Sequence, residues 1–224
     1  MFRLDPDQVY RAEILEQFDW LEHGFGTRHS LAWPPGGNVA TLRQIHSNKV
    51  ILADRPGDLG EGDALISNSA GLTLVIRTAD CLPILIADPE NRAIAAVHAG
   101  WRGTVEQILR ETVQAMSDRF GSRSQDLVIA IGPAIGECCY EVGPEVAEQF
   151  SDLFPERQGP KGTARINLAA AAIRQLRRND GSVGQIDASG LCTRCLREVF
   201  HSYRRDAAAA GRMFSGITIR LANR

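Results

Sequence analysis

The feature that most constrains this chain is a series of short, almost continuously apolar segments in its first half. LTLVIRTAD (residues 72–80), LPILIAD (82–88) and AIAAVHAG (93–100) are rich in isoleucine, leucine, valine and alanine. A strand with one solvated face alternates apolar and polar residues, whereas an unbroken apolar run is typical of a strand covered on both faces. These segments therefore predict a sheet that is buried on both sides.

Further strand-like segments flank this group. NVATLRQIH, KVILAD and DALIS lie before it, whereas DLVIAIG and the closing GITIRL lie after it. Residues 23–37 are interrupted repeatedly by Gly and Pro and are expected to form a loop. Many strands followed by a run of helices favour an α+β architecture over alternating βαβ units. We expect one domain over residues 1–224, with a mixed β-sheet core flanked by helices.

Two helices can be placed from their ends. Thr104 and Gln107 have the spacing of a capping box, and apolar residues recur at helical spacing over residues 105–120. Gly121 is the expected end of that helix. Asn167 is expected to open a later helix, NLAAAAIRQLRR.

The bulk composition argues against several classes of protein. The formal net charge is -2 with no basic block, which disfavours a nucleic-acid partner. No apolar run approaches the roughly 20 residues of a membrane span. The N-terminal MFRLDPDQVYRAEILEQFDW has acidic residues and proline where a signal peptide would be apolar. We expect a soluble cytoplasmic protein, and the sequence leaves its oligomeric state open.

The five cysteines raise the question of which of them carries chemistry, because a cytoplasmic chain of this size folds without disulfides. Cys192 and Cys195 form a single C-x-x-C pair, whereas a closed zinc site needs four ligands, so we expect them to pack. Cys138 and Cys139 are adjacent and are expected not to point at one centre. No chemistry is assigned to these four residues.

The fifth cysteine and two histidines form a candidate metal site. His46, Cys81 and His98 each lie where a predicted strand gives way to a loop, and side chains from a rigid sheet converge at such places. Two imidazoles and one thiolate suit a catalytic zinc, which keeps three protein ligands and an open position. Taken alone, each residue type at such a place is more often a packing residue than a ligand, so spacing leaves both interpretations open.

A resemblance to a known family bears on this choice. The phrases QIHSNKV, GDALIS, TADCLPILIAD, VHAGWRGT and IGPAIGECCYEVG follow one another, with HGFGTRHS before them and FHSYRRD near the end. In this order they resemble the YfiH-like family, whose members are labelled polyphenol oxidases, laccase-domain proteins or purine nucleoside phosphorylases. The similarity spans about Gly24 to Arg212. It implies a fold related to a cysteine-hydrolase-like toxin deamidase domain.

The resemblance also implies a metal centre and an activity. The family's metal ligands map onto His46, Cys81 and His98. The implied cofactor is zinc, and the implied reactions are phosphorolysis of adenosine, inosine and methylthioadenosine, together with adenosine deamination. The segment from Ser30 to Ile45 is shorter than in the family and is a candidate wall of the substrate pocket.

Phosphorolysis requires cations or backbone amides that hold phosphate while one of its oxygens attacks the sugar carbon. Arg28, Arg77 and Arg102 are candidates because each lies within or beside a family phrase. Asp63 and Asp80 are candidates for orienting a metal-bound imidazole or carrying a proton. Solvated arginines and a turn-forming aspartate are the alternative interpretation of these residues.

Three other functions stay open at this stage. A Cys-His hydrolase would use Cys81 as nucleophile and His98 as base, and an alkylating reagent would inactivate it. A non-catalytic zinc-binding module would lose thermal stability with its metal and would consume no nucleoside. A copper-dependent polyphenol oxidase is disfavoured, because four coppers need roughly ten imidazoles and the chain has 5 histidines.

Overall fold

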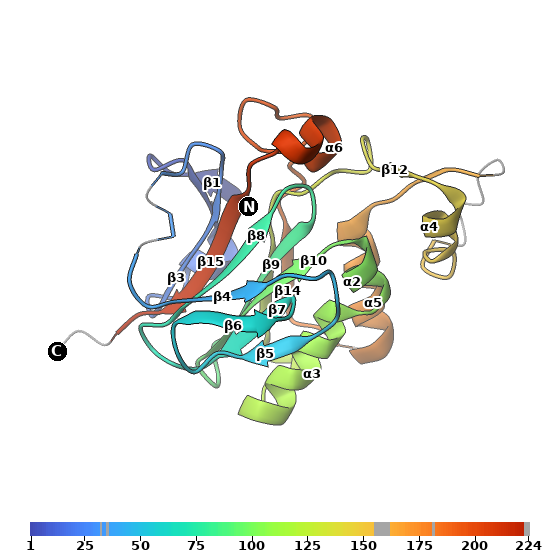
Figure 1. Ribbon diagram of the computed structural model, residues 1–224. Helices are drawn as coiled ribbons and strands as arrows, with labels where there is room; N and C mark the ends of the chain where they lie inside the picture. Colours follow the sequence, from blue (N-terminus) through green and yellow to red (C-terminus); the bar gives the residue numbers. More distant parts are fainter. Residues whose placement is uncertain (32, 35, 155–161, 181, 222–224) are drawn as a thin grey trace.

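The computed structural model describes residues 1–31, 33–34, 36–154, 162–180 and 182–221. At its centre lies a six-stranded sheet in the order β14-β11-β9-β10-β7-β5 (Figure 1). Its strands are β5 (Val50–Leu52), β7 (Ala64–Ser67), β9 (Leu82–Asp88), β10 (Ala93–Ala99), β11 (Val128–Ile131) and β14 (Gln185–Ala188). The sheet is mixed, because β9 pairs with β10 and β11 in antiparallel fashion while β14 and β5 join in parallel.

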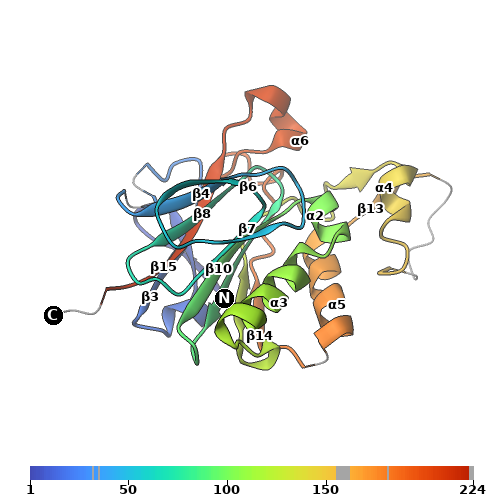
Figure 2. The same ribbon diagram turned by 60° about the horizontal axis from the view of Figure 1, so that its bottom comes forward.

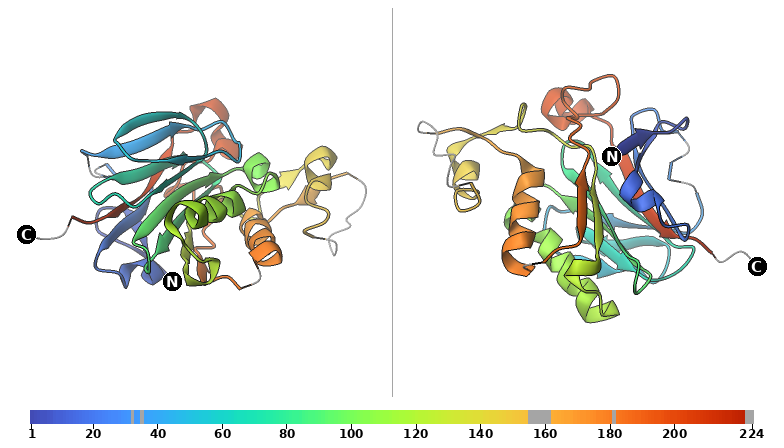
Figure 3. Two further views of the ribbon diagram at one scale, coloured as in Figure 1. Left: turned by 90° about the horizontal axis from the view of Figure 1, so that it is seen from below. Right: turned by 180° about the vertical axis from the view of Figure 1, so that it is seen from behind.

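A second, seven-stranded sheet has the order β1-β2-β3-β15-β8-β4-β6. Its strands are β1 (Phe2–Leu4), β2 (Val9–Ala12), β3 (Leu21–Gly26), β4 (Val39–Arg43), β6 (Gly57–Glu61), β8 (Thr73–Thr78) and β15 (Met213–Ile219). β15 lies between β3 and β8 (Figure 3). It therefore joins the N-terminal strands β1 to β3 to the strands β8, β4 and β6 of the same sheet. A small third sheet pairs β12 (Glu141–Val142) with β13 (Ala164–Arg165).

The longest helices cover the central sheet on the side away from the second sheet. α3 (Ile108–Phe120) and α5 (Leu168–Asp180) run side by side there (Figure 2). The other helices are α1 (Glu13–Glu16), α2 (Trp101–Val105), α4 (Pro144–Glu148) and α6 (Tyr203–Asp206), with 3-10 turns at Ser124–Asp126 and Ala207–Ala209. No helix among the described residues is long and apolar enough to cross a bilayer.

Alternate residues of β10 contact two different apolar cores. Ala93, Ala95 and Val97 belong to the core beneath α3 and α5, whereas Ile94 and Ala96 belong to the core between the two sheets. This is the period of two that places successive side chains on opposite faces of a strand. The prediction of a sheet buried on both sides and the α+β class are therefore confirmed.

The helix expected over residues 105–120 is divided in two. α2 begins at Trp101, and Gln107 adopts a left-handed conformation (φ 64°) before α3 starts. Thr104 lies inside α2, and its buried hydroxyl has no hydrogen-bond partner among the described residues, so the predicted capping box is wrong. Gly121 (φ 74°) ends α3 as expected.

The predicted start of the later helix is confirmed, whereas the predicted N-terminal loop is partly wrong. Asn167 accepts a hydrogen bond from the Ala170 N–H at 2.9 Å, which confirms it as the start of α5. The loop predicted for residues 23–37 is wrong at its beginning, because His23 to Gly26 form the end of β3. Pairing with β15 supplies hydrogen bonds that local composition does not reveal.

Candidate metal centre

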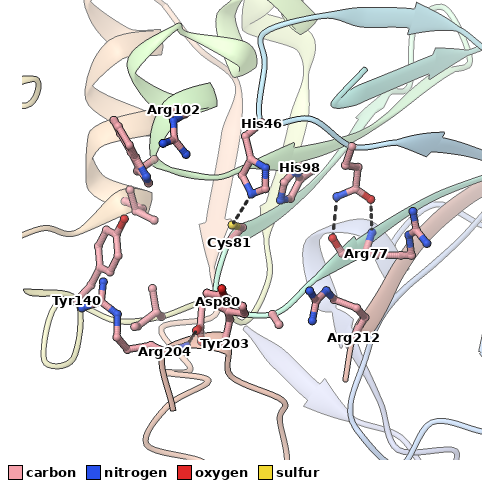
Figure 4. A pocket seen from close by; sticks show the side chains of 15 residues that line it. His46, Arg77, Asp80, Cys81, His98, Arg102, Tyr140, Tyr203, Arg204 and Arg212 are labelled. Carbon is pink, nitrogen blue, oxygen red and sulfur yellow. Dashed lines mark hydrogen bonds between the residues drawn. The ribbon is translucent and has the colours of Figure 1, made fainter. Parts of the chain in front are cut away.

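His46, Cys81 and His98 come together, and their ligand atoms all lie within 4.8 Å of one another. Nε2 of His46 lies 3.9 Å from Sγ of Cys81, and the two imidazole rings meet edge to face with centroids 4.8 Å apart (Figure 4). In a tetrahedral zinc site with N and S ligands, the N···S separation is about 3.6 Å. The three side chains therefore have the donor types and the spacing to hold one metal ion.

Each ligand comes from a different part of the two sheets. His98 lies in β10, Cys81 in the connection from β8 to β9, and His46 in the loop that follows β4. His46 has a left-handed backbone (φ 61°), a conformation that is uncommon outside glycine and that recurs at functional sites. One candidate ligand thus lies in a strand, and the other two lie in connections between strands.

Gly100 allows the three ligands to approach one another. A Cβ at this position would lie 2.8 Å from Cδ2 of His46 and 3.1 Å from Sγ of Cys81. Both distances are shorter than ordinary van der Waals contact, so a side chain here would displace the ligands. The close packing of β10 against the His46 loop therefore depends on a residue without a side chain.

Asp63 hydrogen-bonds to two of the candidate ligands, His46 and His98. Its fully buried carboxylate accepts a hydrogen bond from Nδ1 of His98 at 2.8 Å. The same carboxylate accepts the backbone N–H groups of His46 at 3.0 Å and Ser47 at 2.7 Å. With its proton held on Nδ1, His98 presents Nε2 to a metal, as carboxylate–histidine pairs do in zinc proteins.

The ionisable side chains of the site shift one another's pKa values. Burial opposes ionisation of Cys81, but hydrogen bonds and charge from His46 and His98 lower the pKa of its thiol to about 6. Burial likewise opposes protonation of His98, but Asp63 and Cys81 raise its pKa to about 9. These shifts favour a Cys81 thiolate beside a protonated His98, and a metal cation at the site would compete with that proton.

The triad is part of the lining of a pocket of about 760 Å³. The lining also has cationic, aromatic, polar and apolar side chains, and in full it is Gln44, His46, Arg77, Ala79, Asp80, Cys81, His98, Trp101, Arg102, Ile135, Tyr140, Leu168, Tyr203, Arg204 and Arg212. Arg102 and Tyr140 lie on one side of Cys81, and Arg77 and Arg212 on the other (Figure 4). The pocket can therefore surround a ligand that carries both negative charge and an aromatic ring.

Two of the arginines singled out from sequence line this pocket. Arg102 is exposed, and its guanidinium lies 4.5 Å from the Trp101 ring centroid. The side-chain amide of Gln44 bonds both the N–H and the C=O of Arg77, each at 2.8 Å. This pair ties the loop that carries His46 to β8.

The remaining predicted site residues lie elsewhere or have other partners. Arg28 does not line the pocket, and its guanidinium donates to the carbonyl of Arg197 at 2.9 Å. Asp80 faces the pocket, but its carboxylate accepts from Thr193 at 2.6 Å and from the Arg204 N–H at 2.7 Å. Asp80 therefore links the connection from β8 to β9, which contains Cys81, to Thr193 and to α6. Of the described residues from Ser30 to Ile45, Gln44 lines the pocket.

Several lining residues lie outside the set predicted from the sequence. Tyr140 lies in the phrase GECCYEVG, and Tyr203 and Arg204 lie in FHSYRRD. Arg212 comes just before β15, whose pairing with β8 brings it to the pocket. The first two phrases already carried the family resemblance, so their aromatic and basic residues were the available signal.

The expectation for the other four cysteines is wrong in one respect. Cys138, Cys139, Cys192 and Cys195 gather with their sulfurs within 4.8 Å of one another, although two of them are adjacent in sequence. Cys192 is buried and packs in the core beneath the helices, as expected, whereas Cys138 and Cys195 are exposed.

Comparison with known proteins identifies the family to which the chain is similar. A family model described as multi-copper polyphenol oxidoreductase laccase matches residues 27–220. A purine nucleoside phosphorylase of Deinococcus radiodurans is 42% identical over 185 residues, covering 80% of this chain and 70% of the relative. Adenosine deaminase RL5 of an unknown prokaryotic organism is 36% identical over 191 residues, covering 78% and 72%.

A solved structure extends the similarity to nearly the whole chain. The crystal structure of the hypothetical protein YfiH of Bacillus licheniformis has a TM-score of 0.87 and 28% identity, and the match covers 98% of this chain and 99% of that one. The order of the sequence phrases, the match of the family model and the shared architecture lead to one conclusion. The chain belongs to the laccase-like, YfiH-type family of polyphenol oxidoreductase-labelled proteins.

Proposed function

We propose that this protein is a zinc-dependent purine nucleoside phosphorylase that cleaves adenosine, inosine or methylthioadenosine with phosphate. The observation that carries the proposal is the meeting of a His-Cys-His triad, four arginines and three large aromatic side chains in one pocket. The name of the Deinococcus radiodurans relative supports the same activity.

The reaction exchanges one bond at the sugar. A phosphate oxygen forms a bond to C1′ of the ribose, the bond from C1′ to the purine nitrogen breaks, and the phosphate proton ends on the released base. Charge-assisted hydrogen bonds from arginine suit a phosphate dianion, and Arg77, Arg102, Arg204 and Arg212 surround the pocket. We assign phosphate binding to this group, with Arg77 and Arg102 as its first members.

The aromatic side chains suit the base. Trp101, Tyr140 and Tyr203 present ring faces or edges at the pocket wall, and flat purines stack on such surfaces. Tyr140 is buried, and burial together with the nearby Cys81 raises the pKa of its hydroxyl to about 12. Tyr140 therefore stays protonated at neutral pH and can donate a hydrogen bond to an acceptor on the substrate.

The donor set favours zinc over copper at this centre. One thiolate and two imidazoles bind either metal, but a blue-copper site adds a weak axial ligand, commonly methionine, and the pocket lining among the described residues contains none. A zinc ion here would act as a Lewis acid toward the substrate or its attacking group. The residues of the chain supply its orientation through Asp63 and the charge balance through Cys81. A reducing cytoplasm, the compartment we propose, keeps this thiolate available.

The experiment that tests the proposal is conversion of inosine to hypoxanthine by the purified protein with and without phosphate. We expect hypoxanthine only with phosphate, and loss of activity on chelation and in His98→Ala. Arg28→Gln is the matched control, because Arg28 lies outside the pocket lining. If zinc-loaded protein releases no purine base from any of the three nucleosides, the proposal is wrong.

Two other activities have a specific observation in their favour. The name of adenosine deaminase RL5 supports deamination, which would yield inosine from adenosine without phosphate. The hydrogen bonds of His98 to Cys81 and to Asp63 also resemble a nucleophile with an oriented base. Alkylation of Cys81 would inactivate either enzyme, but a Cys-His hydrolase would withstand a chelator, whereas the zinc-dependent phosphorylase would not.

A further inference from the structure

A second cluster of metal-ligand atoms lies outside the catalytic pocket. The sulfurs of Cys138 and Cys139 are 3.7 Å apart, those of Cys138 and Cys195 are 3.6 Å apart, and those of Cys139 and Cys195 are 3.4 Å apart. The sulfur of Cys192 lies within 4.8 Å of all three. We call these four residues the tetracysteine cluster.

These spacings match the edges of a small tetrahedron. With a Zn–S bond of about 2.3 Å, neighbouring sulfurs in a tetrahedral site lie about 3.8 Å apart. A disulfide requires sulfurs about 2.05 Å apart, and all five cysteines of the chain are free thiols in the structure. Four sulfur ligands in a tetrahedral array are typical of zinc or iron.

Two turns bring the sulfurs together. The N–H groups of Cys139 and Tyr140 both donate to the carbonyl of Gly136, which curls the chain at residues 137–139. A second turn closes where the Leu196 N–H donates to the carbonyl of Cys192 at 3.0 Å. This tight curl is what lets the adjacent cysteines contribute to one centre.

The surroundings of the sulfurs suit bound thiolates. The backbone N–H of Gly136 donates to Sγ of Cys192 at 3.2 Å, and a Cβ on Gly136 would lie 3.2 Å from Cβ of Cys192. N–H···S bonds of this kind are used by proteins to tune metal-bound sulfur. The exposed Arg194 guanidinium hydrogen-bonds to Cys139, which places positive charge beside the cluster.

We propose that Cys138, Cys139, Cys192 and Cys195 bind a second zinc ion in a closed structural site. Zinc takes four thiolates, the four thiol protons pass to solvent, and no position is left for substrate. The ion would fasten the Gly136–Tyr140 turn to the Cys192–Leu196 turn. The site is independent of the proposed phosphorylase activity.

The position of the cluster gives this zinc a role in the pocket. Tyr140 follows Cys139 directly and lines the pocket. Thr193, inside the C-x-x-C pair, donates to Asp80 at 2.6 Å, and Asp80 precedes the catalytic-site Cys81. The tetracysteine cluster therefore lies behind the pocket wall opposite Arg77, and fixing it would fix that wall.

Zinc content of the full chain, measured by elemental analysis after purification with zinc and a reductant, tests the proposal. We expect two zinc ions per chain in the unmodified protein and one in Cys195→Ser. Cys81→Ser is the matched control, because it removes a thiol from the other site and should also retain one. Cobalt distinguishes the two variants: Cys81→Ser should keep the intense absorption of tetrathiolate cobalt, and Cys195→Ser should lose it.

A second measurement covers the case in which Cys195→Ser fails to fold. An organomercurial added to the folded, zinc-loaded Cys81→Ser protein should release one zinc per chain as the remaining thiols are titrated. Release of no zinc, iron in place of zinc, or a mass lowered by two hydrogens per cysteine pair would overturn the proposal. Hypoxanthine formation plays no part in these readouts, so failure of the phosphorylase proposal leaves them unaffected.

Discussion

The carboxylate of Asp63 lies 2.8 Å from Nδ1 of His98, and it also accepts the backbone N–H groups of Ile45, His46 and Ser47. Hydrogen bonds from His98 and Ser47 outweigh the effect of burial and lower the pKa of Asp63 to about 2. A permanently charged, fully buried group therefore orients the ring of one ligand and the backbone of another.

Asp63→Asn should weaken metal binding at the His-Cys-His site by about 10- to 100-fold, the usual effect of losing an outer carboxylate. The amide removes the negative charge and turns one acceptor into a donor that faces backbone N–H groups. A competition titration with a chromophoric chelator measures the affinity, and the melting temperature without metal reports any loss of folding.

Ser47→Ala is the control for this substitution, because it removes the 2.8 Å bond from the Ser47 hydroxyl and leaves the His98 contact in place. We expect metal affinity in Ser47→Ala to fall much less than in Asp63→Asn. Equal affinities in Asp63→Asn and the unmodified protein would show that Asp63 does not position His98.

Gly100→Ala should abolish metal binding at the His-Cys-His triad while the fold survives. The added Cβ would lie 2.8 Å from His46 and 3.1 Å from Cys81, and the exposed His46 loop is the part that can move away. Metal content tests the loss of metal binding, and circular dichroism tests whether the fold survives. Gly36→Ala is the matched substitution, since a Cβ there meets no atom within 4 Å, and retained metal in Gly100→Ala would contradict the packing argument.

Arg102→Gln should raise the KM for phosphate, because the pocket loses one guanidinium while its shape is nearly kept. A hydrogen bond to a charged group is worth about 1.5–3 kcal/mol, which corresponds to a change of roughly 10- to 100-fold. Steady-state kinetics at saturating inosine give the value. Arg28→Gln should leave it unchanged, and equal effects of the two substitutions would remove Arg102 from the phosphate site.

Much of the central architecture could be predicted from the sequence because it rests on local patterns. The apolar runs of β9 and β10 are long enough to reveal burial on both faces, and Gly121 and Asn167 mark helix ends through their own backbone chemistry. The triad could be predicted because His46, Cys81 and His98 each end a predicted strand and lie at the positions to which the family's metal ligands map.

The features that could not be predicted from the sequence depend on contacts between segments that lie far apart in the chain. β3 contains Gly24 and Gly26, and it is a strand because β15, nearly two hundred residues away, pairs with it. Arg212 reaches the pocket through the same strand. The tetracysteine cluster joins residues that lie more than fifty positions apart, so counting cysteines in local motifs could not reveal it.

The buried His23 should make the free energy of unfolding depend on pH. Nε2 of His23 accepts the Ala12 N–H at 2.8 Å, so the ring is neutral in the folded protein. Burial, and then the charge of Arg11, lower its pKa from the ordinary 6.5 to about 3. Between these pKa values the unfolded chain binds the extra proton, so stability is complete above pH 6.5 and decreases as the pH falls toward 3.

The contribution of His23 is about 1.4 kcal/mol per pH unit within this range. Denaturant unfolding at a series of pH values measures it, and the slope, rather than the absolute stability, is the quantity to compare. His23→Gln should flatten the slope by the equivalent of about one proton, even if the altered packing lowers stability at every pH. An unchanged slope in His23→Gln would mean that His23 does not titrate between the two states.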